Sequence, residues 1–194
     1  MTKVLGCLVL SVTVGAIVLG VLQPEPLMEV TAFSLSAAFN PISQIYQTRV
    51  PVAGSRWNYV VIHQSGSVEG NAQTIAEEGM RQRRGDAGHH FVINNGRGAP
   101  DGRIQVSQVW VEQKSGARRG EGLAINVCLV GDFGRRGPGK TQMLQLLALV
   151  RSLQQRCGIP AGNICLANSR DIGLGQWRMF PLKELRENLL TEDL

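Results

Sequence analysis

The residue best suited to catalysis or ligand binding is a histidine at the end of a hydrophobic stretch. Residues 57–65 read WNYVVIHQS, a run rich in β-branched and aromatic residues that is typical of a buried strand and reaches His63 near its end. A turn rich in Gly and Ser follows at 65–70. Because α/β proteins bind ligands at the carboxyl ends of strands, this place favours a binding or catalytic role for His63. The alternative is a strand-end histidine that only hydrogen-bonds to backbone.

The cysteines offer a second kind of chemistry. Cys7 and Cys128 lie inside apolar runs and are expected to be unpaired packing residues. Cys157 and Cys165 flank a short turn, so a disulfide between them is allowed in an oxidising compartment but is not required. The spacing of the two does not fit a standard zinc pattern.

Alternating strand and helix patterns must position these side chains. Strand patterns occur at 57–65, 89–94, 104–111, 123–130 and 163–167. Helix patterns occur at 71–82, at 141–157 and from 181 onward. We expect Ile75 and Met80 to face inward on the first helix. The alternation predicts an α/β domain with a single mixed β-sheet flanked by helices.

The amino-terminal segment predicts a membrane anchor. Residues 4–22 are apolar and uncharged, and a bilayer core needs about 20 apolar residues in a helix. We therefore assign 1–22 to a signal-anchor transmembrane helix, 23–55 to a juxtamembrane tether and 56–194 to the folded domain. Lys3 before the apolar run favours a domain on the extracytoplasmic side. Secretion after cleavage of the leader is the alternative.

The composition limits the kind of partner. The chain carries a net charge of +5, a pI near 9.4 and 18% charged residues, which is typical of a globular domain and favours an anionic partner. The arginines fall in small clusters at 81–84, 118–119 and 135–136. No recognisable nucleic-acid-binding module accompanies them, so we expect solvated loops and helix ends and no nucleic acid.

Four segments carry the pattern of one protein family. WNYVVIHQS at 57–65 is similar to W-x-x-I-V-I-H-H-S, and GHHFVI at 88–93 is similar to G-Y-H-F-V-I. AINVCLVGDF at 124–133 is similar to S-I-G-I-C-L-V-G-D-F. The stretch 158–181 is similar to G-I-P…G-H-R-D…C-P-G-x-x-F-P. In this order and spacing, the segments resemble the type-2 N-acetylmuramoyl-L-alanine amidases, which share their fold with the peptidoglycan-recognition proteins.

The resemblance implies a zinc site, and the chain departs from it. Family members hold zinc with a strand-end His, a His before Arg-Asp, and a Cys or Asp near the end, leaving a fourth position for a reactive water. His63 matches the first ligand, whereas Ser169 and Gly175 occupy the other two positions. His89 replaces the tyrosine of G-Y-H-F, and Arg118 replaces a further family His. A hydroxyl is a poor zinc ligand, and Gly offers no side chain.

These departures predict an amidase-like domain that binds peptidoglycan or muropeptides with catalysis lost or impaired and without a cofactor. Its candidate ligand-binding residues are His63, His89, Arg118 and Trp177. The resemblance assigns His63 and His89 to the catalytic positions.

Two other functions stay open. The first is an active zinc amidase that cleaves the N-acetylmuramoyl–L-alanine bond through a remodelled site made of His63, His89 and Asp171. His89 and His90 are neighbours on a strand, so only one of them faces the side of His63. The second is a structural envelope protein that binds neither metal nor muropeptide.

Overall fold

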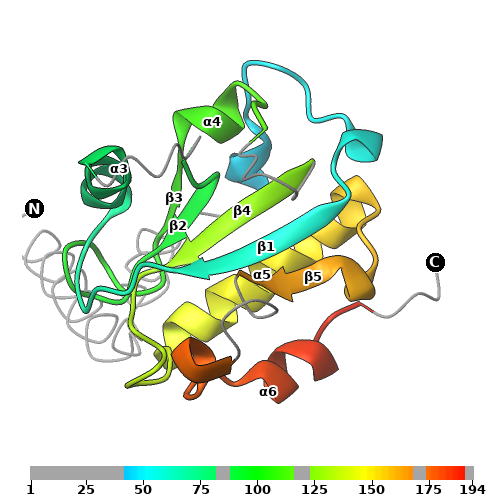
Figure 1. Cartoon of the computed structure of the whole chain (residues 1–194). Coiled ribbons are helices and arrows are strands. Elements are labelled where there is room, and N and C mark those ends of the chain that lie inside the picture. Colours follow the sequence, from blue (N-terminus) through cyan, green and yellow to red (C-terminus); the bar gives the residue numbers. More distant parts are fainter. Residues whose placement is uncertain (1–41, 82–87, 116–122, 168–173, 191–194) are drawn as a thin grey trace, which may run out of the picture. The chain divides into compact units, whose positions relative to one another are not determined.

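A mixed β-sheet forms the centre of the fold (Figure 1). Within the described residues it has five strands, in the order β3-β2-β4-β1-β5. Their bounds are Tyr59–Gln64 (β1), Phe91–Ile93 (β2), Ile104–Val106 (β3), Ala124–Leu129 (β4) and Ile164–Leu166 (β5). Strand β4 pairs in parallel with β1 and β2, β1 pairs in parallel with β5, and β3 is antiparallel to β2. The predicted single mixed sheet with flanking helices is confirmed.

The computed structural model describes residues 42–81, 88–115, 123–167 and 174–190. These residues lie in one compact unit, Ala38–Leu194. The predicted transmembrane helix at 1–22 falls outside the described residues, as does the tether up to residue 41. Among the helices that are described, none is long and apolar enough to cross a membrane.

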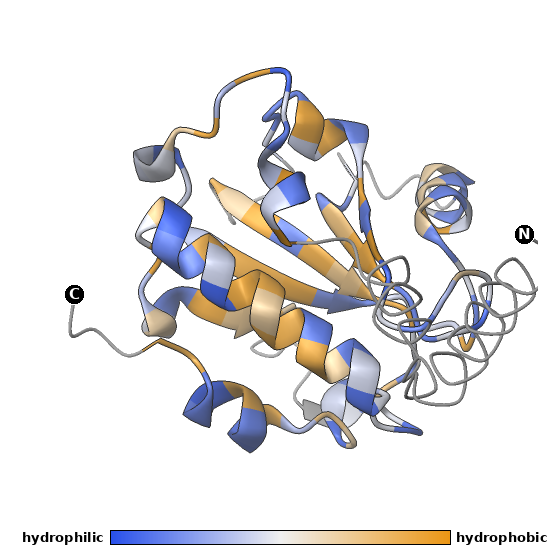
Figure 2. Cartoon of the chain, turned by 180° about the vertical axis from the view of Figure 1, so that it is seen from behind, coloured by the Kyte–Doolittle hydropathy of each residue, from blue (hydrophilic) through white to orange (hydrophobic). Residues whose placement is uncertain are grey.

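Helices lie on both faces of the sheet. The α-helices are Ala72–Arg81 (α3), Gln108–Val111 (α4), Lys140–Cys157 (α5) and Leu182–Glu187 (α6). The long helix α5 crosses one face of the sheet, where it buries an apolar stripe (Figure 2). It stops at Gly158, whose φ of 65° is left-handed and whose N–H donates to the Gln154 carbonyl, as the Gly predicts. Helix α3 packs on the opposite face through Ala72 and Ile75.

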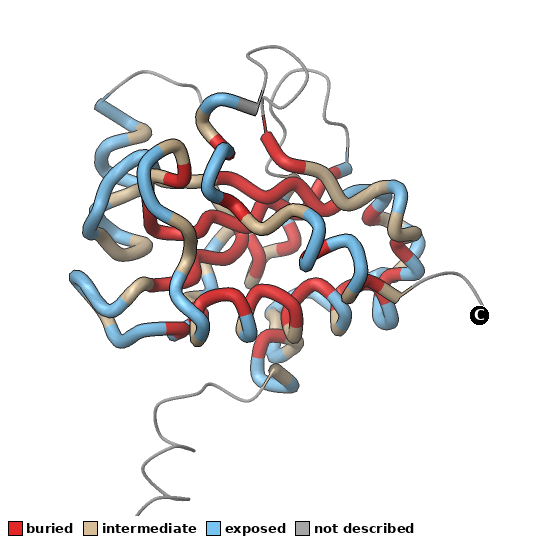
Figure 3. Tube along the Cα trace, turned by 90° about the horizontal axis from the view of Figure 1, so that it is seen from below, coloured by how far each residue is buried: buried red, intermediate tan, exposed pale blue. Residues whose placement is uncertain are grey.

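The alternation of side chains along the strands separates two environments. Val60 and Ile62 point toward α5 and join the main hydrophobic core, which also takes in the buried stripe of α5. Val61 and His63 therefore point to the other face of β1. All six residues of β4 are buried, as expected for the central strand of a covered sheet. Figure 3 shows buried segments running through the interior of the fold. One face of the sheet is therefore apolar, whereas the other face also carries buried polar side chains.

The folded domain begins earlier than the predicted boundary at residue 56. A 3₁₀ helix at Ile42–Tyr46 packs against the core, with Ile45 buried. The indole N–H of Trp110 donates to the Ile45 carbonyl over 2.6 Å, and the Tyr46 hydroxyl lies 2.8 Å from the Ser152 hydroxyl. These contacts tie residues 42–46 to α4 and α5, so this part of the predicted tether belongs to the domain.

Two local expectations differ from the structure. The strand predicted at 104–111 ends at Val106, and α4 follows it, with Trp110 fully buried on a helix. Met80, expected to face inward, is 74% exposed because α3 covers the sheet only with its first turns.

The sequence left a disulfide between Cys157 and Cys165 open, and the structure shows none. Cys157, the last residue of α5, packs in the main core, whereas Cys165 packs against Val61, Ala124 and Ala167 on the other face of the sheet. The two side chains point to opposite sides of the sheet, and no disulfide joins them.

Candidate functional site

His63 lies near the carboxyl end of β1, on the sheet face away from α5. Its side chain is 4% exposed, and its backbone partner on β4 is Cys128. His63 Nε2 lies 3.3 Å from Oδ1 of Asn126, which precedes Cys128 by two residues on β4. An amide oxygen can only accept, so Nε2 of His63 carries the hydrogen of this bond. His63, predicted to lie at a strand end, is therefore part of a buried polar cluster.

The two neighbouring histidines point to different sides, as their adjacency predicts. The His89 ring lies beside the His63 ring, with 4.9 Å between centroids and 51° between planes. His90 instead packs edge-on against Trp57 and Trp110, at centroid distances of 5.2 and 5.9 Å. His89 is thus the histidine that joins His63.

His90 is a buried structural histidine with both ring nitrogens in hydrogen bonds. Its Nδ1 accepts from the backbone N–H of Asn126 over 2.9 Å, and its Nε2 donates to the Lys114 carbonyl over 2.9 Å. Burial lowers the pKa of His90 to about 4, against the opposing effect of the bond to Lys114. His90 is therefore held neutral.

We predict that the domain loses stability as the pH falls from 6.5 to 4. Over this range His90 stays neutral in the folded chain but takes up a proton in the unfolded chain, so acidification favours unfolding. The loss attributable to His90 reaches roughly 3 kcal/mol. Urea unfolding of the native chain and of His90→Gln at several pH values measures it. The native chain should lose more stability than the variant on acidification, and parallel pH curves would contradict the prediction.

A carboxamide at the end of β1 ties together the loops beside His63. Gln64 Nε2 donates to the Gln176 carbonyl over 2.8 Å, and Gln64 Oε1 accepts from the Phe133 N–H over 2.6 Å. One side chain therefore connects β1, the segment after β4 and the 3₁₀ helix Leu174–Trp177. Sequence analysis gave Gln64 no role. The available signal was its departure from the second His of H-H-S.

Asn126 is the other site residue that sequence analysis missed. It is 1% exposed in the middle of β4, and it contacts His63 with its side chain and His90 with its backbone. Its only signal in the sequence is that it stands where the similar motif S-I-G-I-C-L has Gly. Chain folding, not local pattern, brings these residues together.

The donors available for a metal ion are few in the described part of the site. His63 and His89 supply imidazoles, and Gly175, at the third ligand position, is exposed and has no side chain to offer. Ser169 and Asp171 lie outside the described residues. Across 42–81, 88–115, 123–167 and 174–190, no group of three or more His, Cys, Asp or Glu side chains is arranged to hold a metal. The described donors do not fit a three-ligand zinc site.

Trp177 is positioned by the core. Its side chain is 3% exposed, packs against Phe133 and Phe180, and donates from Nε1 to the Ala167 carbonyl over 3.0 Å. It also lines a pocket of about 440 Å³ together with Leu166, Gly175, Arg178, Phe180 and Leu182. This largely apolar pocket gives a ligand access to Trp177.

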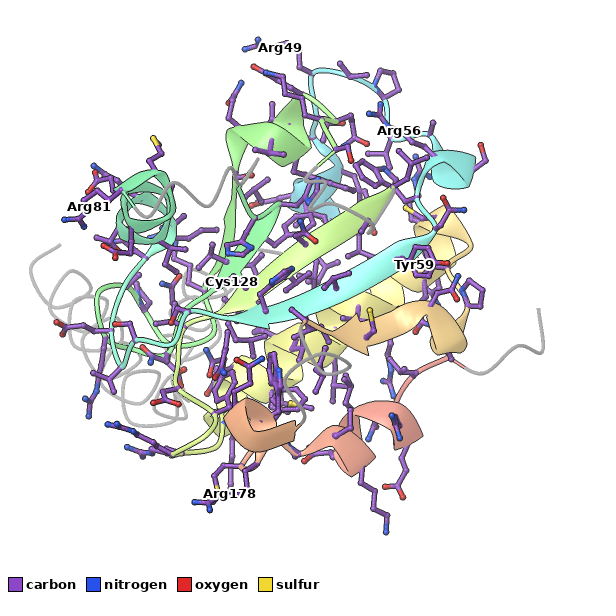
Figure 4. All side chains as sticks on the ribbon, in the orientation of Figure 1. Arg49, Arg56, Tyr59, Arg81, Cys128 and Arg178 are labelled. Carbon is purple, nitrogen blue, oxygen red and sulfur yellow. The ribbon has the colours of Figure 1, made fainter. Side chains whose placement is uncertain are left out.

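The described basic side chains lie toward solvent. Arg49, Arg81 and Arg178 point outward at the periphery of the fold (Figure 4). The side chains of Arg49 and Arg81 are each 72% exposed and pair with carboxylates, which contributes little to stability at such exposure. Arg118, a candidate for ligand binding, falls outside the described residues.

Comparisons with known proteins identify relatives of the chain. Residues 53–174 match the family model described as N-acetylmuramoyl-L-alanine amidase. Two solved structures from Clostridium intestinale URNW are similar, the N-acetylmuramoyl-L-alanine amidase LysC and the endolysine N-acetylmuramoyl-L-alanine amidase LysCS. Each shares 22% identity at a TM-score of 0.48 over 75% of this chain, covering 95% of LysC and 93% of LysCS. No curated protein sequence matches.

Proposed function

Because the chain belongs to the N-acetylmuramoyl-L-alanine amidase family, we propose that its domain binds muropeptides of peptidoglycan at the sheet face around His63 and His89. We further propose that hydrolysis of the N-acetylmuramoyl–L-alanine bond is lost or impaired. The family match supports the substrate class. The donor set of the described site supports the weakened chemistry.

The observation that carries the proposal is the pairing of His63 with His89, together with the lack of a donor at Gly175, the residue that the resemblance assigns to the third ligand position. The two imidazoles lie 4.9 Å apart on the polar face of the sheet, and Gly175 offers only backbone. Two imidazoles and ordered carboxamides provide hydrogen bonds to peptide N–H groups, carbonyls and sugar hydroxyls. A hydrolytic zinc ion, in contrast, requires three protein ligands and one position open to water.

A remodelled zinc amidase is the second candidate, and one observation favours it. The His89 ring has joined the His63 ring, so the chain has placed a new imidazole beside the one family ligand that it keeps. A carboxylate from Asp171 would complete a two-His, one-carboxylate set of the kind that zinc hydrolases use. This site would bind zinc in a manner that depends on both histidines.

The deciding experiment is a digest of purified peptidoglycan with the full chain and added zinc, followed by mass spectrometry. We expect no release of stem peptides while an active family amidase releases them in parallel. Sedimentation with the same peptidoglycan should then retain the native chain. His63→Gln should weaken retention. The surface variant Gln73→Ala should not, because the exposed Gln73 side chain bonds to Glu77 on the same helix, α3.

Each other outcome of that experiment supports a rival function. Free stem peptides would support the remodelled zinc enzyme and overturn the loss of catalysis. Neither release nor retention would support a structural envelope protein that does not bind muropeptides. Equal retention of the native chain and His63→Gln would show that peptidoglycan binds at a surface away from β1.

We also propose that the domain works outside the cytoplasm, held by a membrane anchor at residues 1–22. Two features support this location: peptidoglycan is an extracytoplasmic polymer, and residues 4–22 are uncharged and mostly apolar. Mass spectrometry of the protein purified from membranes should find the amino terminus intact. A mature chain that starts after residue 22 would instead support secretion.

A further inference from the structure

The loop after β2 contains a dipeptide whose two residues can react with each other. Asn95 is followed by Gly96, and no other asparagine in the sequence precedes a glycine. Asn95 is half-buried and Gly96 is exposed, so water reaches the backbone between them. The chemistry available to such a pair is attack of the glycine nitrogen on the asparagine side chain.

The carboxamide of Asn95 folds back toward the backbone that follows it. Its Oδ1 accepts a hydrogen bond from the N–H of Arg97 over 3.1 Å, which is an Asx turn. The ring that this bond closes contains the nitrogen of Gly96, so the carboxamide is held near that nitrogen. The N–H of Arg97 also stabilises the negative charge that develops on Oδ1 when Cγ is attacked.

The nitrogen of Gly96 is accessible for the attack. Gly96 has no Cβ to shield it, and its φ of 84° lies in the left-handed region that favours glycine. In the part of the chain that the structure describes, no group accepts a hydrogen bond from the Gly96 N–H. The proton that must leave before the nitrogen attacks is therefore exposed to bases in the solvent.

We propose that Asn95 is a site of spontaneous deamidation. The Gly96 nitrogen gives up its proton and attacks Cγ of Asn95, so that a new N–C bond forms, the Cγ–Nδ2 bond breaks and ammonia leaves with that proton. Water then opens the resulting succinimide by breaking either of its ring bonds between a carbonyl carbon and the nitrogen. The products are aspartate and isoaspartate, and no group is oxidised or reduced.

The same carboxamide joins two loops. Nδ2 of Asn95 donates to the Val68 carbonyl over 2.9 Å, in the loop at 65–70. A backbone bond runs beside it, from the Gly70 N–H to the Arg97 carbonyl over 3.1 Å. The loop at 65–70 and the loop after β2 are therefore held together at the residue that deamidates.

Deamidation changes the sign of this contact. At neutral pH the product is a carboxylate, which has no hydrogen to donate and repels the carbonyl oxygen of Val68. Isoaspartate also inserts a further carbon into the backbone. The loop at 65–70 directly follows β1, which carries His63, so ageing of the protein loosens the chain beside the polar cluster. This inference does not depend on the proposed function.

Peptide mapping by mass spectrometry tests the reaction in the full chain after incubation at mildly alkaline pH. The peptide that contains Asn95 should gain the mass difference between NH₂ and OH before any other asparagine does. Fragment ions distinguish Asn95 from Asn94, which is fully buried and should stay intact. Asn95→Gln should leave this peptide unmodified, because a longer side chain must close a larger ring. Conversion of another asparagine while Asn95 stays intact, or equal conversion in Asn95→Gln, would overturn the proposal.

Hydrogen exchange of Asn95→Asp tests the effect on the loops. The Gly70 N–H should exchange about tenfold faster than in the native chain, the effect of losing one hydrogen bond. The Val130 N–H, which donates to the Ile93 carbonyl in the sheet, should keep its native rate. An unchanged rate at Gly70, or equal acceleration at Gly70 and Val130, would overturn the local loosening, while the peptide map still decides the site of deamidation.

Discussion

Replacing Trp110 with Ala should lower the free energy of unfolding by about 3–5 kcal/mol, the range for removing a large aromatic side chain from a core. Trp110 is fully buried, and its ring lies 4.8 Å from Phe91 and 5.8 Å from Trp57 between centroids. Its indole N–H also donates to the Ile45 carbonyl. The variant therefore leaves a cavity at the end of the sheet and an unpaired carbonyl in the segment before β1. Urea unfolding followed by circular dichroism measures the loss.

Two further variants separate packing from hydrogen bonding. Trp110→Phe keeps most of the ring but removes the N–H, so it should cost about 1–3 kcal/mol through the unpaired Ile45 carbonyl. Met80→Ala removes a side chain that is 74% exposed and should change stability by less than about 0.5 kcal/mol. A Trp110→Ala variant as stable as Met80→Ala would show that residues 42–46 and α4 do not belong to the cooperative core.

The same region shows where sequence patterns succeed and where they fail. The apolar run at 123–130 predicted the central strand because a strand covered on both faces leaves no position for alternation. The alternation at 104–111 predicted one strand, but the chain leaves the sheet at Ser107 and turns into α4. Apolar residues at 104, 106, 109 and 111 fit a strand with one irregularity as well as a strand followed by a short helix. Only the burial of Trp110 against Phe91 distinguishes the two.

Segment boundaries set by composition fail for a similar reason. Residues 23–55 show no sustained periodicity, which predicted a tether, yet Ile45 is in the core. A five-residue 3₁₀ helix is too short to display a period, and its anchor is the Trp110 indole some 65 positions away in the sequence. A contact between residues so far apart in the sequence produces no pattern within a short stretch of sequence.

The residues of the candidate site also separate into those that local sequence patterns predict and those that they do not. His63 was predictable because a strand pattern locates it and its type suggests chemistry. The alternation of side chains along a strand predicted that only one of His89 and His90 faces His63, and His89, which lies just before β2, is the one that does. Gln64 and Asn126 were not predicted, because an amide gains a role only from the partners that folding brings to it. Their departures from the motif were visible in the sequence, but the contacts that give them meaning come from β4 and the loop at 174–177.

Restoring the two absent donors should turn the chain into a zinc protein. We expect Ser169→His combined with Gly175→Cys to bind about one zinc ion per chain, since with His63 it completes three protein ligands. The native chain should retain much less zinc after gel filtration. At residue 175 a Cβ would meet no heavy atom within 4 Å, so a cysteine side chain can be added there without a clash. Elemental analysis of the filtered protein measures the metal content.

Matched variants test whether the designed donors hold the metal. Ser169→His with Gly175→Ala makes the same backbone change without a thiolate and should bind zinc far more weakly. Adding His63→Ala to the double variant should abolish stoichiometric binding, because it removes the ligand from β1. A double variant that stays free of zinc would show that residues 169 and 175 are not where the family places its ligands. Stoichiometric zinc in the native chain that is lost with His63→Ala would instead favour the remodelled enzyme.

Zinc binding in the double variant should not bring back full hydrolysis. A metal-bound water attacks an amide only when the carbonyl is polarised and the developing charge is stabilised, and these tasks fall to side chains around the metal. His89 stands where the family resemblance places a tyrosine for the carbonyl, and Arg118 stands where it places a further His. The His63 ring is also bonded to Asn126, a contact that Gly at residue 126 would not make. If zinc binding returns but the rate of hydrolysis does not, the loss of the zinc ligands is only one cause of the lost catalysis. The other polar side chains on this face of the sheet would then contribute to it as well.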